Sequence, residues 1–151
     1  MFAPKIILHP TDFSDCSGYA LSIACDLAKQ HNAKILVLYV AETLGPENVT
    51  YGEAVSQLQP LGYRGRLEKY LTEAAPQPDG FSIEHVLSEG DPAREIDRLA
   101  RKHQADLIVM GTHGHTGLER LLMGSVAEAV VRLAPCPVLT AKILCAGGKA
   151  K

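Results

Sequence analysis

Three short, continuous apolar runs constrain the fold of this chain more than any other feature of its sequence. They read KIILH over residues 5–9, KILVLYV over residues 34–40 and ADLIVM over residues 105–110. A strand with one face in water alternates apolar and polar residues, so runs this continuous predict strands in a sheet covered on both faces. Apolar residues recur at helical spacing over residues 15–31 and 91–103. Strands that alternate with helices predict an α/β domain with a mainly parallel sheet.

Proline, aspartate and serine residues predict where several elements begin or end. Pro10 is expected to close the first strand. Asp91 followed by Pro92 predicts a helix start, with the aspartate as N-cap and the proline at the first helical position. Ser125 followed three residues later by Glu128 predicts another start, with a capping box.

Two more strands bring the predicted number to five. SIEHVL, residues 82–87, alternates in polarity and predicts a third strand in chain order. VLTAKIL, from Val138 to Leu144, predicts the last strand. Residues 44–80 contain prolines and glycines that interrupt the helical pattern there, so the sequence leaves this region undefined.

Length and composition fit one globular domain. The chain has 151 residues, of which 46% are hydrophobic, enough to form a core without disulfides. No internal repeat or linker occurs, so residues 1–145 are expected to form a single domain. The last residues, AGGKAK over 146–151, are expected to be a flexible tail.

Charge and cysteine content argue against several classes of protein. Lys and Arg total 15 against 17 Asp and Glu, which leaves no excess of cations for a nucleic-acid partner. The N-terminal residues lack the features of a signal peptide, and no apolar run approaches the ~18 residues of a membrane span. The four cysteines form no CxxC pair, so we expect free thiols and a cytoplasmic protein.

The stretch GTHGHTGLERLLMGS, residues 111–125, is the strongest candidate for a binding site. It follows a predicted buried strand and precedes a predicted helix, and ligands of open α/β sheets bind at such strand ends. Glycines allow close approach of the backbone, and a helix N-terminus attracts phosphate. The stretch lacks the Lys of a P-loop, and GxGxxG is absent. Physical reasoning alone therefore leaves a phosphate site and a structural loop as equal alternatives.

Three stretches resemble the universal stress protein family: PTDFSD at 10–15, EGDPAREI at 89–96, and DLIVMGTHGHTGLERLLMGSVAEAVVRLAPCPVL at 106–139. The nucleotide-binding branch of that family carries G-x2-G-x9-G-[ST]. Gly111, Gly114, Gly124 and Ser125 match this spacing without a gap. The resemblance extends from about residue 5 to residue 143 and is weak over 44–80, where the family also varies.

The resemblance implies a fold and a function. It implies a single open, Rossmann-like sheet of five strands in the order 3-2-1-4-5, with helices on both faces. ATP would lie across strands 1 and 4, and the protein would act as a nucleotide-binding stress-response module. It also implies a homodimer that pairs through the last strand, from Val138 to Leu144, and an unidentified protein partner.

The resemblance also assigns roles to particular residues. Val40 would meet the adenine through its backbone, and Asp12 would face the ribose or a Mg²⁺ ion that bridges the phosphates, a role that suits a hard carboxylate ligand. His113 is expected to pack over the nucleotide or to bond within its loop. The ribose would be lined by Pro10, Thr11, Met110 and Gly111, and the phosphates would be held by Gly114, Gly124, Ser125 and Val126.

Some interpretations stay open at the level of sequence. His115 stands where the family usually has a basic residue, which would weaken phosphate binding if that side chain contacts the phosphates. Asp12 could instead cap the following helix. His9 is expected to be a satisfied buried polar group, and His113 and His115 lack the third ligand of a zinc site.

No nucleophile–base pair is evident, so any ATP hydrolysis should be slow. Two alternative classes are an enzyme, either an ATPase or an ATP-dependent transferase, and a nucleotide-free dimeric chaperone or scaffold. The sequence does not distinguish ATP from AMP or a cyclic nucleotide, because a phosphate loop does not fix the number of phosphates.

Overall fold

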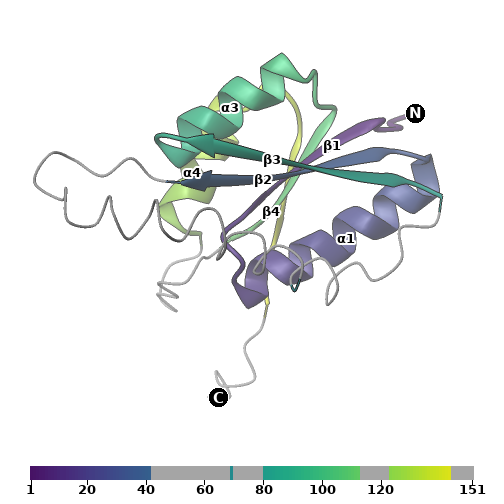
Figure 1. Ribbon diagram of the computed structural model, residues 1–151, viewed down its shortest axis with the longest axis horizontal. Coiled ribbons are helices and arrows are strands. Elements are labelled where there is room, and N and C mark those ends of the chain that lie inside the picture. The colour runs from purple at the N-terminus through teal and green to yellow at the C-terminus, as the bar shows by residue number, and fades with distance from the viewer. Residues whose placement is uncertain (42–68, 70–79, 113–122, 144–151) are drawn as a thin grey trace, which may run out of the picture.

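A computed structural model describes residues 1–41, 69, 80–112 and 123–143 of the chain (Figure 1). Within them, strands and helices alternate in the predicted order. The strands are β1 (Ile6–Thr11), β2 (Lys34–Ala41), β3 (Ser82–Glu89), β4 (Leu107–Gly111) and β5 (Val138–Ala141), and the helices are α1 (Asp15–His31), α3 (Pro92–Lys102) and α4 (Ser125–Leu133).

The five strands form one parallel sheet in the order β3-β2-β1-β4-β5. This confirms the predicted strand number, direction and order. The chain moves outward from β1 through β2 to β3, then crosses back to β4 on the other side of β1. The order of connection therefore reverses between β1 and β4, the position at which α/β sheets bind ligands.

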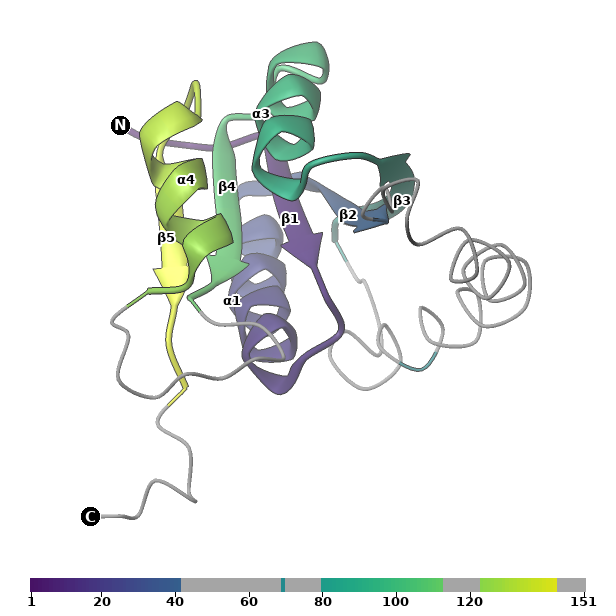
Figure 2. The same cartoon turned by 90° about the vertical axis from the view of Figure 1, so that its left-hand side faces the viewer.

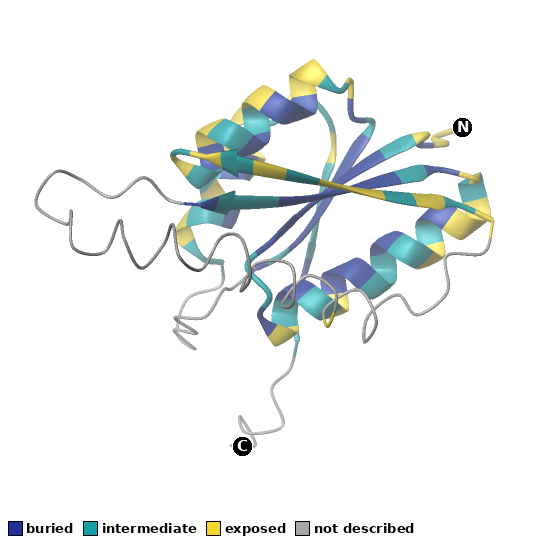
Figure 3. Cartoon of the chain, viewed as in Figure 1, coloured by how far each residue is buried: buried dark blue, intermediate teal, exposed yellow. Residues whose placement is uncertain are grey.

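Helices cover both faces of the sheet, as predicted. Helix α1 lies on one face, and α3 and α4 lie together on the other (Figures 1 and 2). Each face has its own apolar cluster: Ile7 and Val109 belong to the α1 side, and Leu8 and Ile108 to the α3–α4 side. Burial is concentrated in the central strands, whereas the edge strand β3 is largely exposed (Figure 3).

The start of α3 confirms the cap expected from the sequence. The Asp91 side chain caps α3 by accepting a hydrogen bond from the Arg94 N–H at 3.0 Å, with Pro92 in the first turn. This bond satisfies a donor that has no partner within the helix. Among the described residues, no helix is long and apolar enough to cross a bilayer.

The ends of β1, β3 and β5 differ from the prediction, and β3 continues to Glu89 instead of ending at Leu87. β1 continues through Pro10 to Thr11 instead of closing at the proline. β5 ends at Ala141, and the described residues beyond it are not in a strand, whereas the prediction continued to Leu144, which lies outside the described residues. The expected tail, 146–151, also lies outside them.

Hydrogen-bond direction explains how Pro10 fits within a central strand. The Lys5 carbonyl accepts from the Lys34 N–H of β2, and the Ile6 carbonyl accepts from the Asp106 N–H beside β4. Backbone groups alternate in direction along a strand, so residues 6, 8 and 10 face β4. Pro10 has no N–H to offer β4 but removes nothing from the ladder with β2, which continues to Thr11.

The missing N–H also explains where β1 and β4 part. Their pairing covers only Ile7 with Leu107 and Leu8 with Ile108, although both strands continue beyond it. The His9 Nδ1 lies 2.8 Å from the Val109 carbonyl oxygen, which can only accept, so Nδ1 carries the proton. The imidazole thus supplies β4 with a donor at the position where the proline supplies none.

His9 is fully buried and neutral in the folded protein. Burial lowers the pKa of its imidazole from 6.5 to about 4, and the smaller effects of the Val109 carbonyl and the Asp12 charge, which raise the pKa, do not offset it. Between these two pH values the unfolded chain binds more protons at this residue than the folded chain does. The free energy of unfolding should therefore be at its full value above about pH 6.5 and fall as the pH drops toward 4.

We expect this loss to reach about 3 kcal/mol over the full range, since each pKa unit corresponds to roughly 1.4 kcal/mol. Urea unfolding at intervals between pH 7 and 4.5 measures it. The range stops there because the pKa of Glu95 is lowered from 4.5 to about 2, so protonation of this carboxyl in the unfolded chain adds a second loss of stability as the pH falls further.

The control separates His9 from the other histidines. His9→Asn should be less stable at neutral pH but should lose less further stability on acidification. His85→Asn, at an exposed position on β3, should keep the wild-type slope. Equal slopes for the wild type and His9→Asn would show that His9 is not the titrating group.

Candidate functional site

The predicted site residues that the structure describes lie at the carboxyl edge of the sheet or at the helix end beside it. Because all five strands are parallel, their C-terminal ends meet at this edge. His113, Gly114 and His115 lie outside the described residues. Of the others, Pro10 and Thr11 end β1, Asp12 follows it, Val40 is the penultimate residue of β2, Met110 and Gly111 end β4, and Gly124, Ser125 and Val126 form the start of α4.

The turn between β1 and α1 is fixed by side-chain hydrogen bonds. The Thr11 Oγ1 accepts from the Phe13 N–H at 2.9 Å and from the Ser17 hydroxyl at 2.7 Å. The Asp12 Oδ1 accepts from the Ser14 N–H at 2.9 Å. The alternative that Asp12 caps α1 was wrong: Ser14 is the N-cap, and its side chain accepts from the Ser17 N–H. Asp12 instead closes an Asx turn two residues before the helix.

Residue Thr112 joins β4 to the start of α4. Its N–H donates to the Ala141 carbonyl at 2.9 Å, and its carbonyl accepts from the Gly124 N–H at 2.6 Å. The two ends of the glycine stretch are therefore held together beside β4. Figure 2 shows the N-terminal end of α4 at the edge toward which the β4 and β5 arrowheads point.

The predicted capping box at Ser125 was wrong. Gly124 is the N-cap, with φ −69° and ψ 164°, and its carbonyl accepts from the Glu128 N–H at 3.0 Å. The Gly124 N–H donates to Thr112, which holds Gly124 outside the helix, so the helix begins at Ser125, one residue earlier than a serine cap requires. Within the described residues, no side chain caps α4. The first-turn amides, from Ser125 to Ala127, thus have no side-chain acceptor in the described part of the chain, and they carry the positive end of the helix dipole.

Buried polar side chains gather at the same edge. In the described residues, all the buried polar or charged side chains lie in the second half of β1, at the start of α1 or directly after β4: His9, Thr11, Ser14, Ser17 and Thr112. Burying a polar group is costly unless it is hydrogen-bonded, so such groups are few and specifically placed. Their concentration marks this edge as the polar part of an otherwise apolar core.

Gly111 has a packing role that the sequence did not reveal. A Cβ at this position would lie 2.9 Å from the Cys16 Sγ and 3.1 Å from the Cys16 carbonyl carbon. Glycine is therefore required because the first turn of α1 packs directly on the end of β4. The Cys16 thiol completes the contact by donating to the Ala141 carbonyl at 3.3 Å.

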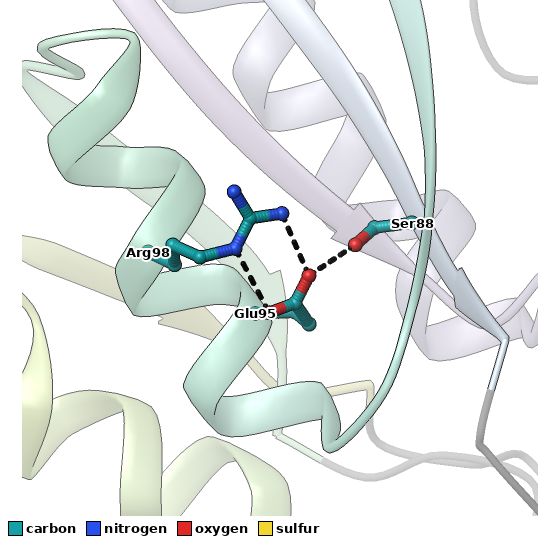
Figure 4. A network of polar contacts seen from close by, with 3 residues as sticks. All are labelled: Ser88, Glu95 and Arg98. Carbon is teal, nitrogen blue, oxygen red and sulfur yellow. Dashed lines mark hydrogen bonds and ion pairs between the residues drawn. The ribbon is translucent and has the colours of Figure 1, made fainter.

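A separate polar network fixes the turn between β3 and α3 (Figure 4). The Glu95 carboxylate accepts from the Ser88 hydroxyl and from the Arg98 guanidinium. The hydrogen bond from Arg98, followed by that from Ser88, lowers the pKa of Glu95 to about 2. Both partners lie on the carboxylate itself, so this group is committed to structure and is a poor candidate for a catalytic base.

Metal and thiol chemistry have little support in the described residues. They contain no cluster of three or more His, Cys, Asp or Glu side chains that could hold a metal ion. Asp12 could therefore bind a cation only together with oxygens of a ligand. Cys16, Cys25 and Cys136 are free, as expected. Burial raises the pKa of Cys25 to about 11 and also raises that of Cys136, which makes these two thiols unreactive.

Sequence reasoning missed three residues that build this edge. Ser14 is not among the predicted caps, although a serine directly before the first residue of a helix is a common N-cap. Thr112, directly after Gly111, has no sequence feature that distinguishes it from the rest of the glycine stretch. Tyr39, whose ring stacks on Phe13, carried no signal beyond its place in an apolar run.

The family assignment rests on most of the chain. A model of the universal stress protein family matches residues 4–142. This chain belongs to the universal stress protein family.

Known universal stress proteins resemble it in sequence and fold. Universal stress protein MJ0531 of Methanocaldococcus jannaschii is 42% identical over 141 residues, which cover 91% of this chain and 82% of the relative. The solved structure of MJ0577 from the same organism has a TM-score of 0.81 and 27% identity, covering 96% of this chain and 99% of the other. A universal stress protein in complex with cAMP has a TM-score of 0.68 and 25% identity, covering 92% and 97%.

The contact at Gly111 leads to a stability prediction. Gly111→Ala should lower the free energy of unfolding by about 1–3 kcal/mol, because the added methyl group overpacks the interface between α1 and β4. In a Cys16→Ala background the cost should be smaller but should not vanish, since the Cys16 backbone atoms at 3.1 Å and 3.2 Å remain. Urea unfolding of the four proteins measures both effects. A Gly111→Ala variant as stable as the wild type would contradict the packing role.

Proposed function

We propose that this universal stress protein binds an adenine nucleotide, with ATP as the principal ligand, at the carboxyl edge of its sheet. The observation that carries the proposal is the N-terminus of α4, which no side chain of the described residues caps and which the Gly124–Thr112 bond holds beside the end of β4. Backbone amides at such a terminus favour phosphate. The related protein solved with cAMP supports an adenine nucleotide as the ligand class.

The described residues fit the phosphate groups through backbone donors. Gly124 has no side chain to fill the space in front of the helix, and Ser125 is exposed. The amides of Ser125 and Val126 would donate to phosphate oxygens, together with Gly114 from the preceding stretch. These amides do not determine how many phosphates the ligand has. The choice of ATP over other adenine nucleotides is therefore part of the proposal, and membership of the family does not imply it.

The ribose and the base would lie toward β1 and β2. Pro10, Thr11, Met110 and Gly111 would line the ribose, and the Val40 backbone would meet the adenine. Asp12 would bind a ribose hydroxyl or share a Mg²⁺ ion with the phosphates. One Asp12 oxygen already accepts from the Ser14 N–H, which fixes the direction of the carboxylate. A divalent ion would supply charge neutralisation for the phosphates there.

The proposed role is that of a cytoplasmic, nucleotide-responsive binding module in the stress response, with another protein as its target. Two alternative functions are an enzyme that turns over ATP and a scaffold that binds no nucleotide. In the described part of the site, the Asp12 carboxylate follows β1, and the His9 imidazole within β1 is buried and neutral. That arrangement favours binding over catalysis, because the His9 imidazole already donates to a carbonyl and the Asp12 carboxylate already accepts from a backbone N–H.

A proline substitution tests the phosphate site with little effect on the fold. Ser125→Pro removes one amide donor and the hydroxyl, yet proline is favoured at the first helical position, and Gly124 already has the extended conformation required before a proline. The Kd for ATP should rise about tenfold or more, since a charge-assisted hydrogen bond contributes about 1.5–3 kcal/mol. Isothermal titration calorimetry of ATP with Mg²⁺ measures it.

The matched control is Ser125→Ala, which keeps the amide and removes only the hydroxyl. It should bind ATP more tightly than Ser125→Pro, and both should unfold at about the wild-type temperature. Nucleotide released from the freshly purified protein by denaturation gives a second readout. Equal affinities for the wild type and Ser125→Pro would remove α4 from the site, and no binding by the wild type would contradict the proposal.

Homodimerisation through the free edge of β5 is part of the same proposal. The carbonyls of Pro137 and Ala141 accept from β4, so the backbone groups of Thr140 face away from it. Thr140→Pro removes an outward N–H without touching the ladder and should weaken the dimer about tenfold or more. Sedimentation equilibrium measures it, with Thr140→Val as the control that keeps the N–H. A monomeric wild type would contradict this part of the proposal.

A further inference from the structure

Phe13 has a backbone conformation that a bulky residue seldom adopts. Its φ is 65°, in the left-handed region that glycine and asparagine favour. The other described non-glycine residues with positive φ are Asn32, the C-cap of α1, and Gln104, directly after the C-cap of α3. Such values are common where helices end. Phe13 instead precedes a helix, so its conformation needs another explanation.

The hydrogen bonds of the turn do not require a phenylalanine. Thr11 accepts from the Phe13 backbone, and Asp12 accepts from the Ser14 backbone. Glycine at position 13 would offer the same N–H and adopt this φ at lower cost. The feature that glycine lacks is the ring, which stacks on the Tyr39 ring with a centroid separation of 5.1 Å and an interplanar angle of 29°.

Tyr39 connects two parts of the proposed site. It lies on β2 in register with Thr11 and immediately precedes Val40, the proposed contact of the adenine. Its ring partner, Phe13, immediately follows Asp12. Both aromatic side chains are half-buried, at the border of the core and not within it. The stack therefore ties the end of β2 to the turn that carries the Asp12 carboxylate.

We propose that Tyr39 is a positioning residue: through its stack on Phe13 it holds the β1–α1 turn, and with it the Asp12 carboxylate, in the orientation that binds the nucleotide. This inference rests on the proposed function but makes a separate claim about the turn itself. Strained backbone persists where the surrounding contacts hold it, and such sites are often ligand sites. The alternative is that the two rings only add apolar contact, in which case their loss would change stability alone.

Hydrogen exchange tests the claim without any ligand. In Tyr39→Leu the amides of Phe13 and Ser14, which donate within the turn, should exchange about tenfold faster relative to the amide of Ile7 in the core of the sheet. Tyr39→Phe keeps the ring and should exchange as the wild type does. Tyr19→Leu makes the same chemical change at an exposed position on α1 and is the matched control.

Two results would overturn the proposal at this stage. One is that Tyr39→Leu leaves the exchange of the turn amides unchanged. The other is that it speeds the turn amides and Ile7 by the same factor, which would reflect global stability.

ATP affinity provides the second test. Tyr39→Leu should raise the Kd for ATP with Mg²⁺ about tenfold, and Tyr39→Phe should restore it. Phe13→Gly removes the ring but suits the backbone, so it should weaken binding to a similar extent with an unfolding temperature near that of the wild type. Wild-type affinity in Phe13→Gly or Tyr39→Leu would overturn the positioning role.

The two tests separate failure of this proposal from failure of the proposed function. If the wild type does not bind ATP, the nucleotide function fails, and the proposal that Tyr39 orients a nucleotide site is overturned with it. Faster exchange at Phe13 and Ser14 in Tyr39→Leu would then still identify the stack as the element that holds the turn. If the wild type binds and both ring variants bind equally well, only the positioning role fails.

Discussion

The hydrogen bond from His9 to the Val109 carbonyl is the interaction on which the arrangement of the site depends. It lies between β1 and β4, the two strands at which the order of connection reverses. Pro10 ends their backbone ladder by withholding an N–H, and the imidazole satisfies the carbonyl that the ladder leaves. The strands can then separate at the carboxyl edge without leaving a buried acceptor unpaired, which would cost about 1–3 kcal/mol. The strand ends therefore separate at the position where the connections of the sheet run in opposite directions.

The glycines of the 111–125 stretch serve the fold and the site in different ways. Gly111 gives space to the first turn of α1, so its absence of a side chain is explained by packing before any ligand is considered. Gly124 caps α4 through its backbone and leaves the first-turn amides without a side-chain acceptor. A serine cap, as the sequence led us to expect, would have filled that position. The same motif can therefore combine a structural requirement at its start with an open helix terminus at its end.

Sequence alone predicted the strands and helices of this fold better than the residues at which they begin and end. Continuous apolar runs identified the buried strands because both faces of the sheet are covered, and the helical stripes identified α1 and α3. The strand order came from the resemblance to a family and not from periodicity. The ends of these elements were harder to predict because single backbone hydrogen bonds decide them. The bond from Gly124 to Thr112 places the cap of α4 one residue before the predicted Ser125, and Pro10 remains within β1 because its strand is hydrogen-bonded to β2 on the side that needs no proline N–H. No residue pattern encodes these contacts, since each depends on which strand lies alongside.

The described groups at the carboxyl edge suit the proposed binding of a nucleotide. Its described donors are mostly backbone amides, which hold an anion at fixed geometry but cannot take up a proton. Its buried imidazole already donates to a carbonyl, and burial holds its pKa near 4, so it stays neutral at physiological pH. Its carboxylate, Asp12, is restrained by a backbone bond that suits orientation of a ligand more than attack on one. For the proposed nucleotide, backbone amides and the restrained Asp12 carboxylate would hold the ligand at fixed geometry, which suits the proposed role of a binding module.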